Sequence, residues 1–370
     1  MSLHVSTSAP RAAHPAPAPA ELSARVTAAL RAFTARWRAE LADVDAGLLP
    51  AMDVLDGLLS GGKRLRPAFC YWAWRGAGGD PAGPGGDDAI VAAAASLELL
   101  QASALIHDDV MDDSDTRRGR PAAHRAFAEL HHRNGWRAPS SVFGTGAAIL
   151  LGDLCLAWSD AMFTGCGLAP EAVAAARPVY DAMRTELMCG QYLDLAEQAR
   201  GVSSVESALH VVRYKSAKYT VERPLHVGAA LAGRADLTGA YTAFGMPLGV
   251  AFQLRDDVLG VFGDPAETGK PAGDDLREGK RTVLVASALE RAGSAGAEVL
   301  RARLGDPELD ASGVAELRDI IRDSGALAAC ESMIDGYAAE SRRALAAAPI
   351  TDHARTALSA LATAATTRRS

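Results

Sequence analysis

Five aspartates close an apolar helical stretch between Leu99 and Gly119, and two arginines follow them. Asp108 and Asp112 are four residues apart, so on a helix they share one face, with Asp109 beside them. Carboxylates on one face repel each other unless a cation lies between them, and Mg²⁺ binds through one or two carboxylates together with substrate phosphates. The guanidinium group of arginine matches phosphate oxygens as a fork. The stretch therefore predicts a Mg²⁺–diphosphate site at the mouth of an apolar pocket, with a solvated acidic helix end as the alternative.

A second acidic helix end follows further along the chain. Gln253, Asp256 and Asp257 lie at positions i, i+3 and i+4 and close another apolar run, after which glycine and basic residues follow. Two such ends favour a pair of facing helices that hold metal between them. Basic residues lie close to the breaks between helices, where together they could surround two diphosphates: Lys63, Arg66, Arg117, Arg118, Lys215, Lys270 and Lys280.

The elements that position these side chains are predicted to be helices. Hydrophobic residues make up 49% of the chain but aromatic residues only 5%, so alanine and leucine dominate and favour helix over strand. No segment shows the sustained alternation of a strand. Helices are expected over residues 20–53, 89–113, 145–163, 170–198, 205–219, 225–231, 240–262, 286–303, 312–346 and 351–367. We expect a single all-α domain over residues 21–370 and an Ala/Pro-rich disordered tail over residues 1–20.

Composition argues against several classes of protein. The net charge of −7 provides no basic footprint for nucleic acid. No apolar run is long enough for a membrane span, so we expect no stable membrane insertion. The five cysteines have no paired spacing, which is typical of a reducing compartment. The N-terminal stretch lacks the apolar region of a signal peptide, and we predict a cytoplasmic protein.

The order of the motifs resembles that of the trans-isoprenyl diphosphate synthases, the polyprenyl synthetase family. The motif DDxxD reads Asp108-Asp109-Val110-Met111-Asp112, followed by Arg117-Arg118-Gly119; GGKxxRP reads Gly61-Gly62-Lys63-Arg64-Leu65-Arg66-Pro67; GQxLD reads Gly190-Gln191-Tyr192-Leu193-Asp194; the Lys-Thr pair is Lys215-Ser216; and the second aspartate-rich region is Phe252-Gln253-Leu254-Arg255-Asp256-Asp257, with Gly269-Lys270 and Gly279-Lys280-Arg281-Thr282 behind it. These motifs span about residues 58–285 and are jointly very specific.

The resemblance implies a helical bundle around a deep apolar cavity and a Mg²⁺-dependent transfer of prenyl groups. An allylic diphosphate (dimethylallyl, geranyl or farnesyl) ionises, and isopentenyl diphosphate attacks the allyl cation head-to-tail. By this resemblance Asp108 and Asp112 hold two Mg²⁺ ions and Asp256 a third. The resemblance also implies that Arg117, Lys215 and Lys270 clamp the allylic diphosphate, and that Lys63, Arg66 and Arg118 bind isopentenyl diphosphate. Gln101 would donate a hydrogen bond, and Lys280 would make further substrate contacts. Support of the site or lining of the cation's path is implied for Gln191, Asp194, Ser216 and Gln253. The family also implies a homodimer.

Small residues precede the first motif, which bears on the length of the product. Ser103 and Ala104 lie five and four residues before Asp108, so an aromatic floor for a fifteen-carbon chain is absent. This predicts geranylgeranyl diphosphate, with longer chains or farnesyl diphosphate as alternatives. A lower floor is expected from Met183, Leu187 and Met188.

One position departs from the family pattern. The second motif would end in aspartate, but Gly260 stands there, which leaves open a weaker third metal site or a regulatory subunit. A class I terpene cyclase is the nearest alternative enzyme. The basic pair Lys63 and Arg66 and the scarcity of aromatic residues both argue against a cyclase.

Overall fold

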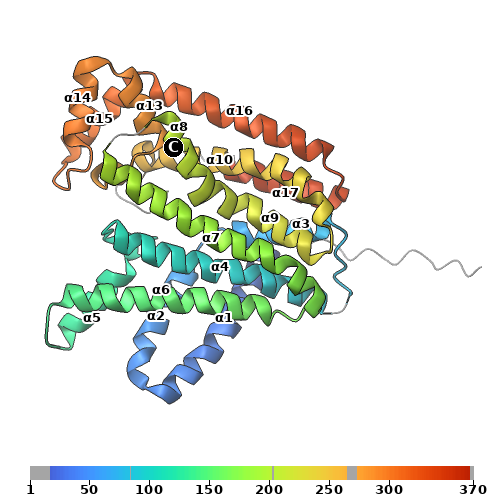
Figure 1. The fold of residues 1–370 in the computed structure, drawn as a ribbon. Coiled ribbons are helices and arrows are strands. Elements are labelled where there is room, and N and C mark those ends of the chain that lie inside the picture. Colours follow the sequence, from blue (N-terminus) through green and yellow to red (C-terminus); the bar gives the residue numbers. More distant parts are fainter. Residues whose placement is uncertain (1–16, 84, 202–203, 265–272, 367–370) are drawn as a thin grey trace, which may run out of the picture.

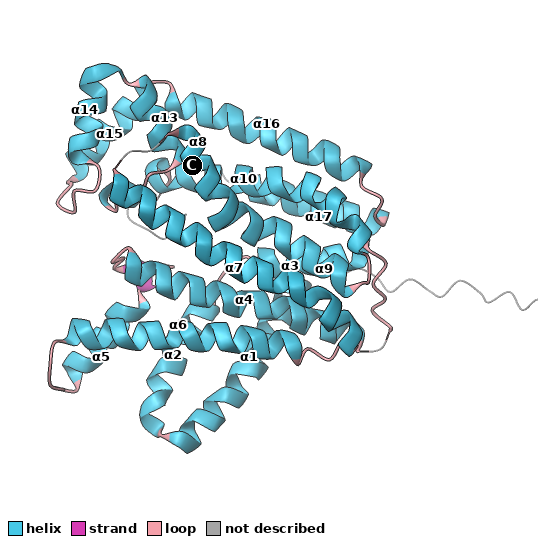
Figure 2. Cartoon of the chain, viewed as in Figure 1, coloured by secondary structure: helices cyan, strands magenta, loops and turns pink. Residues whose placement is uncertain are grey.

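Helices build nearly all of this computed structural model, which describes residues 17–83, 85–201, 204–264 and 273–366 (Figures 1 and 2). The helices are α1 (Pro19–Val44), η1 (Ala46–Leu48), α2 (Leu49–Leu59), α3 (Leu65–Gly76), α4 (Gly86–Met111), α5 (Ala123–Arg133), α6 (Ser140–Thr164), α7 (Pro170–Arg200), α8 (Val205–Val211), η2 (Val212–Glu222), α9 (Arg223–Leu231), η3 (Ala235–Leu237), α10 (Thr238–Phe262), α12 (Asp274–Arg277), α13 (Val283–Arg291), α14 (Gly293–Arg303), α15 (Ala311–Asp323), α16 (Ala326–Ala347) and α17 (Asp352–Thr366). Two short strands, β1 (Thr116–Arg117) and β2 (Arg120–Pro121), pair antiparallel. The predicted all-α class is confirmed.

Helix α4 lies inside the bundle, in contact with α1, α3 and α6. It is apolar on nearly every side, and such a helix is stable in water only when neighbours cover it. Three consecutive alanines, at positions 93–95, are fully buried, and their small side chains leave room for close packing. The acidic end of α4 therefore projects from a helix that is held firmly from several directions.

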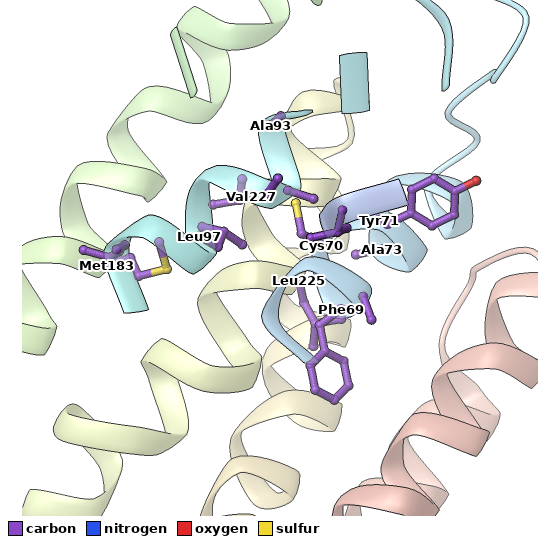
Figure 3. Packing of buried hydrophobic residues seen from close by; sticks show 14 of the residues in the cluster. Phe69, Cys70, Tyr71, Ala73, Ala93, Leu97, Met183, Leu225 and Val227 are labelled. Atoms are coloured by element: carbon purple, nitrogen blue, oxygen red, sulfur yellow. The ribbon is translucent and has the colours of Figure 1, made fainter. Parts of the chain in front are cut away.

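The buried side chains form two clusters. The larger one joins α4 to α1, α2, α3, α6, α7, α9 and part of α10, and Figure 3 shows some of its members, among them Phe69, Leu97, Met183 and Leu225. The smaller one packs α10 and η2 against the helices from α12 to α16. Since α10 contributes to both clusters, the second aspartate-rich region is anchored to both.

Several helix boundaries differ from those predicted. The expected helix over residues 286–303 is divided into α13 and α14, and that over 312–346 into α15 and α16. Gly293 and Gly325 stand at these breaks with positive φ angles of 61° and 76°, a conformation that glycine adopts without steric cost. The first helix ends at Val44, and the small β1–β2 hairpin was not foreseen. Residues 1–16 of the expected tail lie outside the described residues, and α1 begins at Pro19.

The expectation that no apolar run is long enough for a membrane span was wrong by length and composition alone, since α4 and α6 both reach that length and hydropathy. In α4, 78% of the most apolar window is buried inside the protein, as in an ordinary core helix, but in α6 only 28% is buried. Four large apolar side chains of α6 are exposed: Val142, Phe143, Ile149 and Leu150. Val142 and Ile149 are seven residues apart, as are Phe143 and Leu150, and this spacing of about two helical turns places them along one face of the helix.

Candidate active site

The first aspartate motif lies where α4 ends. Asp108 is on the last turn, and Asp112 is the residue that caps the C-terminus of the helix. The next residue, Asp113, has a φ angle of 52° and turns the chain into the β1–β2 hairpin. This hairpin returns the arginine pair toward the carboxylates that precede it.

Arg117 is held by the buried Asp109. Its Nε donates to Asp109 Oδ1 at 2.8 Å, and its Nη2 lies 3.5 Å from Asp108 Oδ2. Asp109 therefore positions Arg117, since its carboxylate accepts from the arginine and the residue is only 2% exposed. Asp115, by contrast, has a side chain that is 83% exposed and pairs with Arg125.

Helices α7 and η2 bring a lysine against the same aspartate. Lys215 Nζ lies 3.1 Å from Asp108 Oδ1 and 2.5 Å from Asp194 Oδ2, and Gln191 Nε2 donates to Asp108 Oδ1 at 3.0 Å. A Cβ added at Gly190 would lie 2.3 Å from the Lys215 backbone nitrogen. Glycine is therefore required at this point of the GQxLD motif, because α7 and the π-helix η2 touch there backbone to backbone.

Lys280 approaches from the segment that follows α12. Its Nζ lies 3.5 Å from Asp112 Oδ2, 3.8 Å from Asp275 Oδ1 and 2.7 Å from Glu278 Oε2. Glu278 in turn accepts a hydrogen bond of 3.0 Å from Ser114. This cluster ties the first aspartate motif to the C-terminal half of the chain.

The second aspartate-rich region lies near the end of α10. Gln253 Nε2 donates to Asp257 Oδ1 at 2.8 Å, and Asp256 is half-buried. A Cβ added at Gly260 would lie 1.8 Å from Asp275 Oδ2. The Asp275 carboxylate thus occupies the space directly over Gly260, where the family pattern has its last aspartate.

The two aspartates of the first motif have opposite titration behaviour. Burial acts to raise the pKa of Asp108, but Lys215, Lys280 and Arg117 outweigh it and lower the pKa below its usual range. Burial and the negative charge of Asp108 raise the pKa of Asp112 to about 6. Asp108 is thus an ionised group among cations, whereas the cations near Asp112 do not offset its burial and the negative charge of Asp108.

Several carboxylate oxygens near the ends of α4 and α10 are buried in a way that suits a divalent cation. Both carboxylate oxygens of Asp112 are buried, and among the described residues neither has a hydrogen-bond partner. The same holds for Asp257 Oδ2, and burial raises the pKa of Asp257 to about 8. Within the described ranges no three His, Cys, Asp or Glu side chains converge into a ready-made metal site. The arrangement fits Mg²⁺ bound by one or two carboxylates and completed by phosphate and water.

A basic pocket lies beside Gln101. The guanidinium carbon of Arg66 is 4.2 Å from the centre of the Tyr219 ring, and Arg66 Nη2 donates to Thr220 Oγ1 at 2.7 Å. The Tyr219 hydroxyl donates to Gln101 Oε1 at 2.6 Å. Lys63 is exposed at the rim.

Arg118 joins this pocket from the hairpin. Its Nη1 donates to the carbonyls of Leu58 and Gly61 at 2.7 and 3.1 Å. The loop that precedes α3 and the hairpin that follows α4 are therefore in direct contact. Two motifs that are more than fifty residues apart in the sequence thus share one site.

The remaining predicted residues have the following places. Ser103 is buried, while Ala104 and Ser216 are half-buried; Lys270 lies outside the described residues. Met183 and Leu187 are buried as expected of a floor, but Met188 is 51% exposed, so its expected place in the floor was wrong.

Sequence reasoning missed four residues that pair with the predicted ones: Tyr219, Thr220, Asp275 and Glu278. Tyr219 and Thr220 lie one helical turn after Lys215-Ser216. Asp275 and Glu278 belong to the charged segment before Lys280. Asp275 and Glu278 could have been found in the sequence, because they are acidic residues close to the predicted Lys280.

The comparisons with known proteins agree with this geometry. The sequence model of the polyprenyl synthetase family matches residues 51–321. A crystal structure of geranylgeranyl pyrophosphate synthase from Corynebacterium glutamicum, complexed with isoprenyl diphosphate and magnesium, is similar with a TM-score of 0.91 and 41% identity, and the match covers 94% of this chain and 99% of that one.

Two curated relatives cover most of this chain. Geranylfarnesyl diphosphate synthase from Aeropyrum pernix is 34% identical over 79% of this chain and 86% of its own length. Nonaprenyl diphosphate synthase from Mycobacterium tuberculosis is 32% identical over 90% and 93%. Other matched relatives are named farnesyl or geranylgeranyl diphosphate synthases. With its motifs assembled around one site and its family match over most of its length, this chain belongs to the polyprenyl synthetase family and is a trans-prenyltransferase, a prenyl diphosphate synthase.

Proposed function

We propose that this enzyme condenses isopentenyl diphosphate with allylic diphosphates up to the twenty-carbon product, geranylgeranyl diphosphate. The family is Mg²⁺-dependent and uses isopentenyl and allylic diphosphates as substrates. The observation that carries the proposal is the convergence of Arg117, Lys215 and Lys280 on the carboxylates of Asp108 and Asp112. A cation-rich site of this kind stabilises a diphosphate leaving group as its negative charge develops.

The allylic site uses both aspartate-rich regions. Asp108, Asp112 and Asp256 would hold Mg²⁺, three ions with the allylic diphosphate bound, and the metal supplies the positive charge that neutralises the leaving group. Arg117 and Lys215 bind the same diphosphate, and Gln253 orients the buried Asp257. Once phosphate enters, Arg117 and Lys215 exchange part of their contact with Asp108 for contact with the phosphate oxygens. Lys280 approaches from the segment that follows α12 and binds the same diphosphate. Lys270, which is outside the described residues, is proposed from its motif as a further member of the clamp.

The basic pocket takes isopentenyl diphosphate. Lys63, Arg66 and Arg118 bind its diphosphate, and Gln101 keeps Tyr219 and therefore Arg66 in place. Because this pocket and the aspartates share α4, the nucleophile meets the allyl cation beside the same helix. Gln191, Asp194 and Ser216 support Lys215 and line the path of the cation.

Asp275 bears on the glycine that departs from the family pattern. Its carboxylate lies over Gly260, at the place that an aspartate side chain at position 260 would have to share. We infer that Asp275 provides the acidic group that the second motif lacks. This supports an active subunit with a complete third metal site over a regulatory subunit.

The small side chains of Ser103 and Ala104 set the chain length. They leave room for the growing chain along α4, and the fully buried Leu97 and Met183 belong to the cluster that closes the bundle further down (Figure 3). The twenty-carbon product is proposed because the side chains at positions 103 and 104 are small, whereas the large side chains of Leu97 and Met183 are fully buried deeper in the bundle.

The enzyme is proposed to act as a cytoplasmic homodimer. The exposed apolar face of α6, formed by Val142, Phe143, Ile149 and Leu150, is the surface that a second copy is proposed to cover.

Product analysis with each allylic primer tests the proposed function. The purified chain with Mg²⁺ and labelled isopentenyl diphosphate should extend dimethylallyl, geranyl and farnesyl diphosphate to one twenty-carbon product. A fifteen-carbon ceiling or products longer than twenty carbons would reject the proposed length. A hydrocarbon formed from geranylgeranyl diphosphate alone would indicate a cyclase, and no turnover without a partner protein would indicate a regulatory subunit.

A further inference from the structure

Arg64 belongs to the basic loop between α2 and α3, but its contacts lie inside the protein. The side chain is only 3% exposed, and each guanidinium nitrogen has a partner. Its Nη1 donates to Glu98 Oε2 at 2.6 Å, its Nε to Thr27 Oγ1 at 3.4 Å and its Nη2 to the Leu59 carbonyl. One buried side chain therefore connects the start of α3 to α1, α2 and α4.

The backbone at Arg64 is also unusual. Its φ and ψ angles are 52° and 37°, the left-handed region, which is sterically unfavourable for a residue other than glycine. The partner Glu98 is buried as well, and a buried ion pair adds little net stability because both charges must leave water. A strained, buried pair that stabilises the fold so little points to a role in fixing geometry.

The pair closes a ring of contacts around the basic pocket. Glu98 and Gln101 are one turn apart on α4, and Gln101 accepts from the Tyr219 hydroxyl at 2.6 Å. Tyr219 lies under the guanidinium of Arg66, which is two residues beyond Arg64. The ring therefore runs from α4 through η2 to the start of α3 and back to α4, and the Arg64–Glu98 contact is the link that closes it.

The other end of the basic loop is fixed by Arg118. This arginine bonds to the carbonyls of Leu58 and Gly61, and a Cβ at Gly62 would lie 3.1 Å from its Nη2. Burial lowers the pKa of Arg118, neighbouring arginines act in the same direction, and Glu98 is the acidic group that opposes them. Glu98 thus also offsets the mutual repulsion of the cations that must gather here.

We propose that Arg64 and Glu98 are positioning residues for isopentenyl diphosphate: their buried ion pair holds the basic loop on α4 so that Lys63, Arg66 and Arg118 converge on one diphosphate. This inference rests on the proposed function, because that function assigns the pocket its substrate. Neither residue touches the reacting atoms. The pair acts on the isopentenyl pocket and leaves the allylic clamp at Asp108 intact.

Steady-state kinetics of the full chain test the proposal. In Glu98→Gln the shape is kept but Arg64 loses its charged partner, and we expect KM for isopentenyl diphosphate to rise about tenfold or more, since small misplacements of binding groups are costly. The KM for farnesyl diphosphate and kcat at saturating isopentenyl diphosphate should change less than about twofold. Binding of isopentenyl diphosphate without metal, followed by calorimetry, should weaken in parallel. Arg64→Lys keeps the positive charge opposite Glu98, so its affinity for isopentenyl diphosphate should fall less than that of Glu98→Gln.

A second variant covers the case in which an unpaired buried arginine prevents folding. Arg64→Met combined with Glu98→Leu removes both charges and keeps the volume, a replacement that buried ion pairs commonly tolerate. This double variant should fold and show the same selective loss of affinity for isopentenyl diphosphate.

The control breaks an ion pair at the opposite end of α4. Asp87 pairs with Arg25 of α1 and accepts from the Tyr71 hydroxyl at 2.9 Å, so Asp87→Asn should lower Tm without changing either KM. An unchanged KM for isopentenyl diphosphate in the Glu98 and double variants, or an equal loss for both substrates, would overturn the proposal. Failure of the proposed function would look different, because the unmodified chain would then form no product that depends on isopentenyl diphosphate.

Discussion

The two aspartates at the end of α4 have opposite electrostatic surroundings although they are one helical turn apart. Asp108 is surrounded by Lys215, Arg117 and Lys280, which keep it ionised. Asp112 is buried with both oxygens lacking hydrogen-bond partners in the described part of the chain. At the proposed metal site, a divalent cation would satisfy Asp112 and compete with the lysines and Arg117 for Asp108, so metal binding is expected to rearrange the cluster.

Replacing Asp112 tests its role at the level of one side chain. Asp112→Asn should lower kcat by at least about a hundredfold, because a metal-binding carboxylate is lost at the leaving group. Assays over a range of Mg²⁺ concentrations check this. Asp115→Asn is the matched control, since Asp115 is in the same acidic run but is 83% exposed, and it should retain nearly full activity. Comparable losses in the two variants would contradict the assignment.

The pH dependence of Mg²⁺ binding follows from the raised pKa of Asp112, about 6. A raised pKa favours the protonated form, so for this group the metal-free fold is most stable below pH 4 and loses that contribution as the pH rises through 6. Metal binding requires the carboxylate and releases the proton. Calorimetry in buffers of different ionisation enthalpy should detect about one proton more released at pH 5.5 than at pH 8, where Asp112 is already ionised. Equal release at both values would argue against this titration.

At the scale of elements, the position of Lys215 depends on how α7 meets η2. Gly190 lets the two backbones touch, and Asp194 holds the lysine from one turn further along α7. On the far side of this contact, Glu186 of α7 pairs with Arg223 and Lys218. The π-helix is therefore fastened to α7 on both sides of the glycine, which fixes Lys215 relative to α4.

Helix packing is also expected to set the proposed product length. Ser103→Phe should shorten the product to fifteen carbons, because an aromatic ring near the mouth of the cavity stops the growing chain. Met183→Ala should instead lengthen it, since removal of a fully buried side chain opens space between helices, with a stability loss of about 2–5 kcal/mol. Chromatography of the dephosphorylated products measures both changes. Unchanged products in both variants would mean that the chain runs elsewhere.

At the scale of the whole molecule, the apolar face of α6 predicts self-association. Leu150→Glu places a charge on this face, where Leu150 is 65% exposed, and should convert the proposed dimer to a monomer at micromolar concentration. Light scattering coupled to gel filtration measures the mass. Val44→Glu is the control, because Val44 is also exposed but lies at the end of α1. If both variants have the mass of the unmodified protein, α6 is not the interface.

The sequence by itself determined the chemistry and the class of fold. Asp108 and Asp112 could be paired from spacing alone, because four residues complete about one turn of any α-helix. The helical class followed from alanine and leucine, which favour helix whatever their neighbours are. The family resemblance, carried by ordered motifs, is confirmed by the comparisons. The breaks at Gly293 and Gly325 escaped prediction because an isolated glycine interrupts one helix and is tolerated in another.

Only the tertiary structure decided which side chains meet. Spacing could not reveal that Lys215 bonds to Asp108 from a distance of 107 residues, that Asp275 lies over Gly260, or that Arg64 is buried against Glu98 while its neighbour Lys63 is exposed. These contacts depend on how helices far apart in the chain pack together. They also depend on a left-handed backbone at Arg64, which the residue type disfavours. Local spacing fixes what lies on one face of a helix, and packing fixes what that face meets.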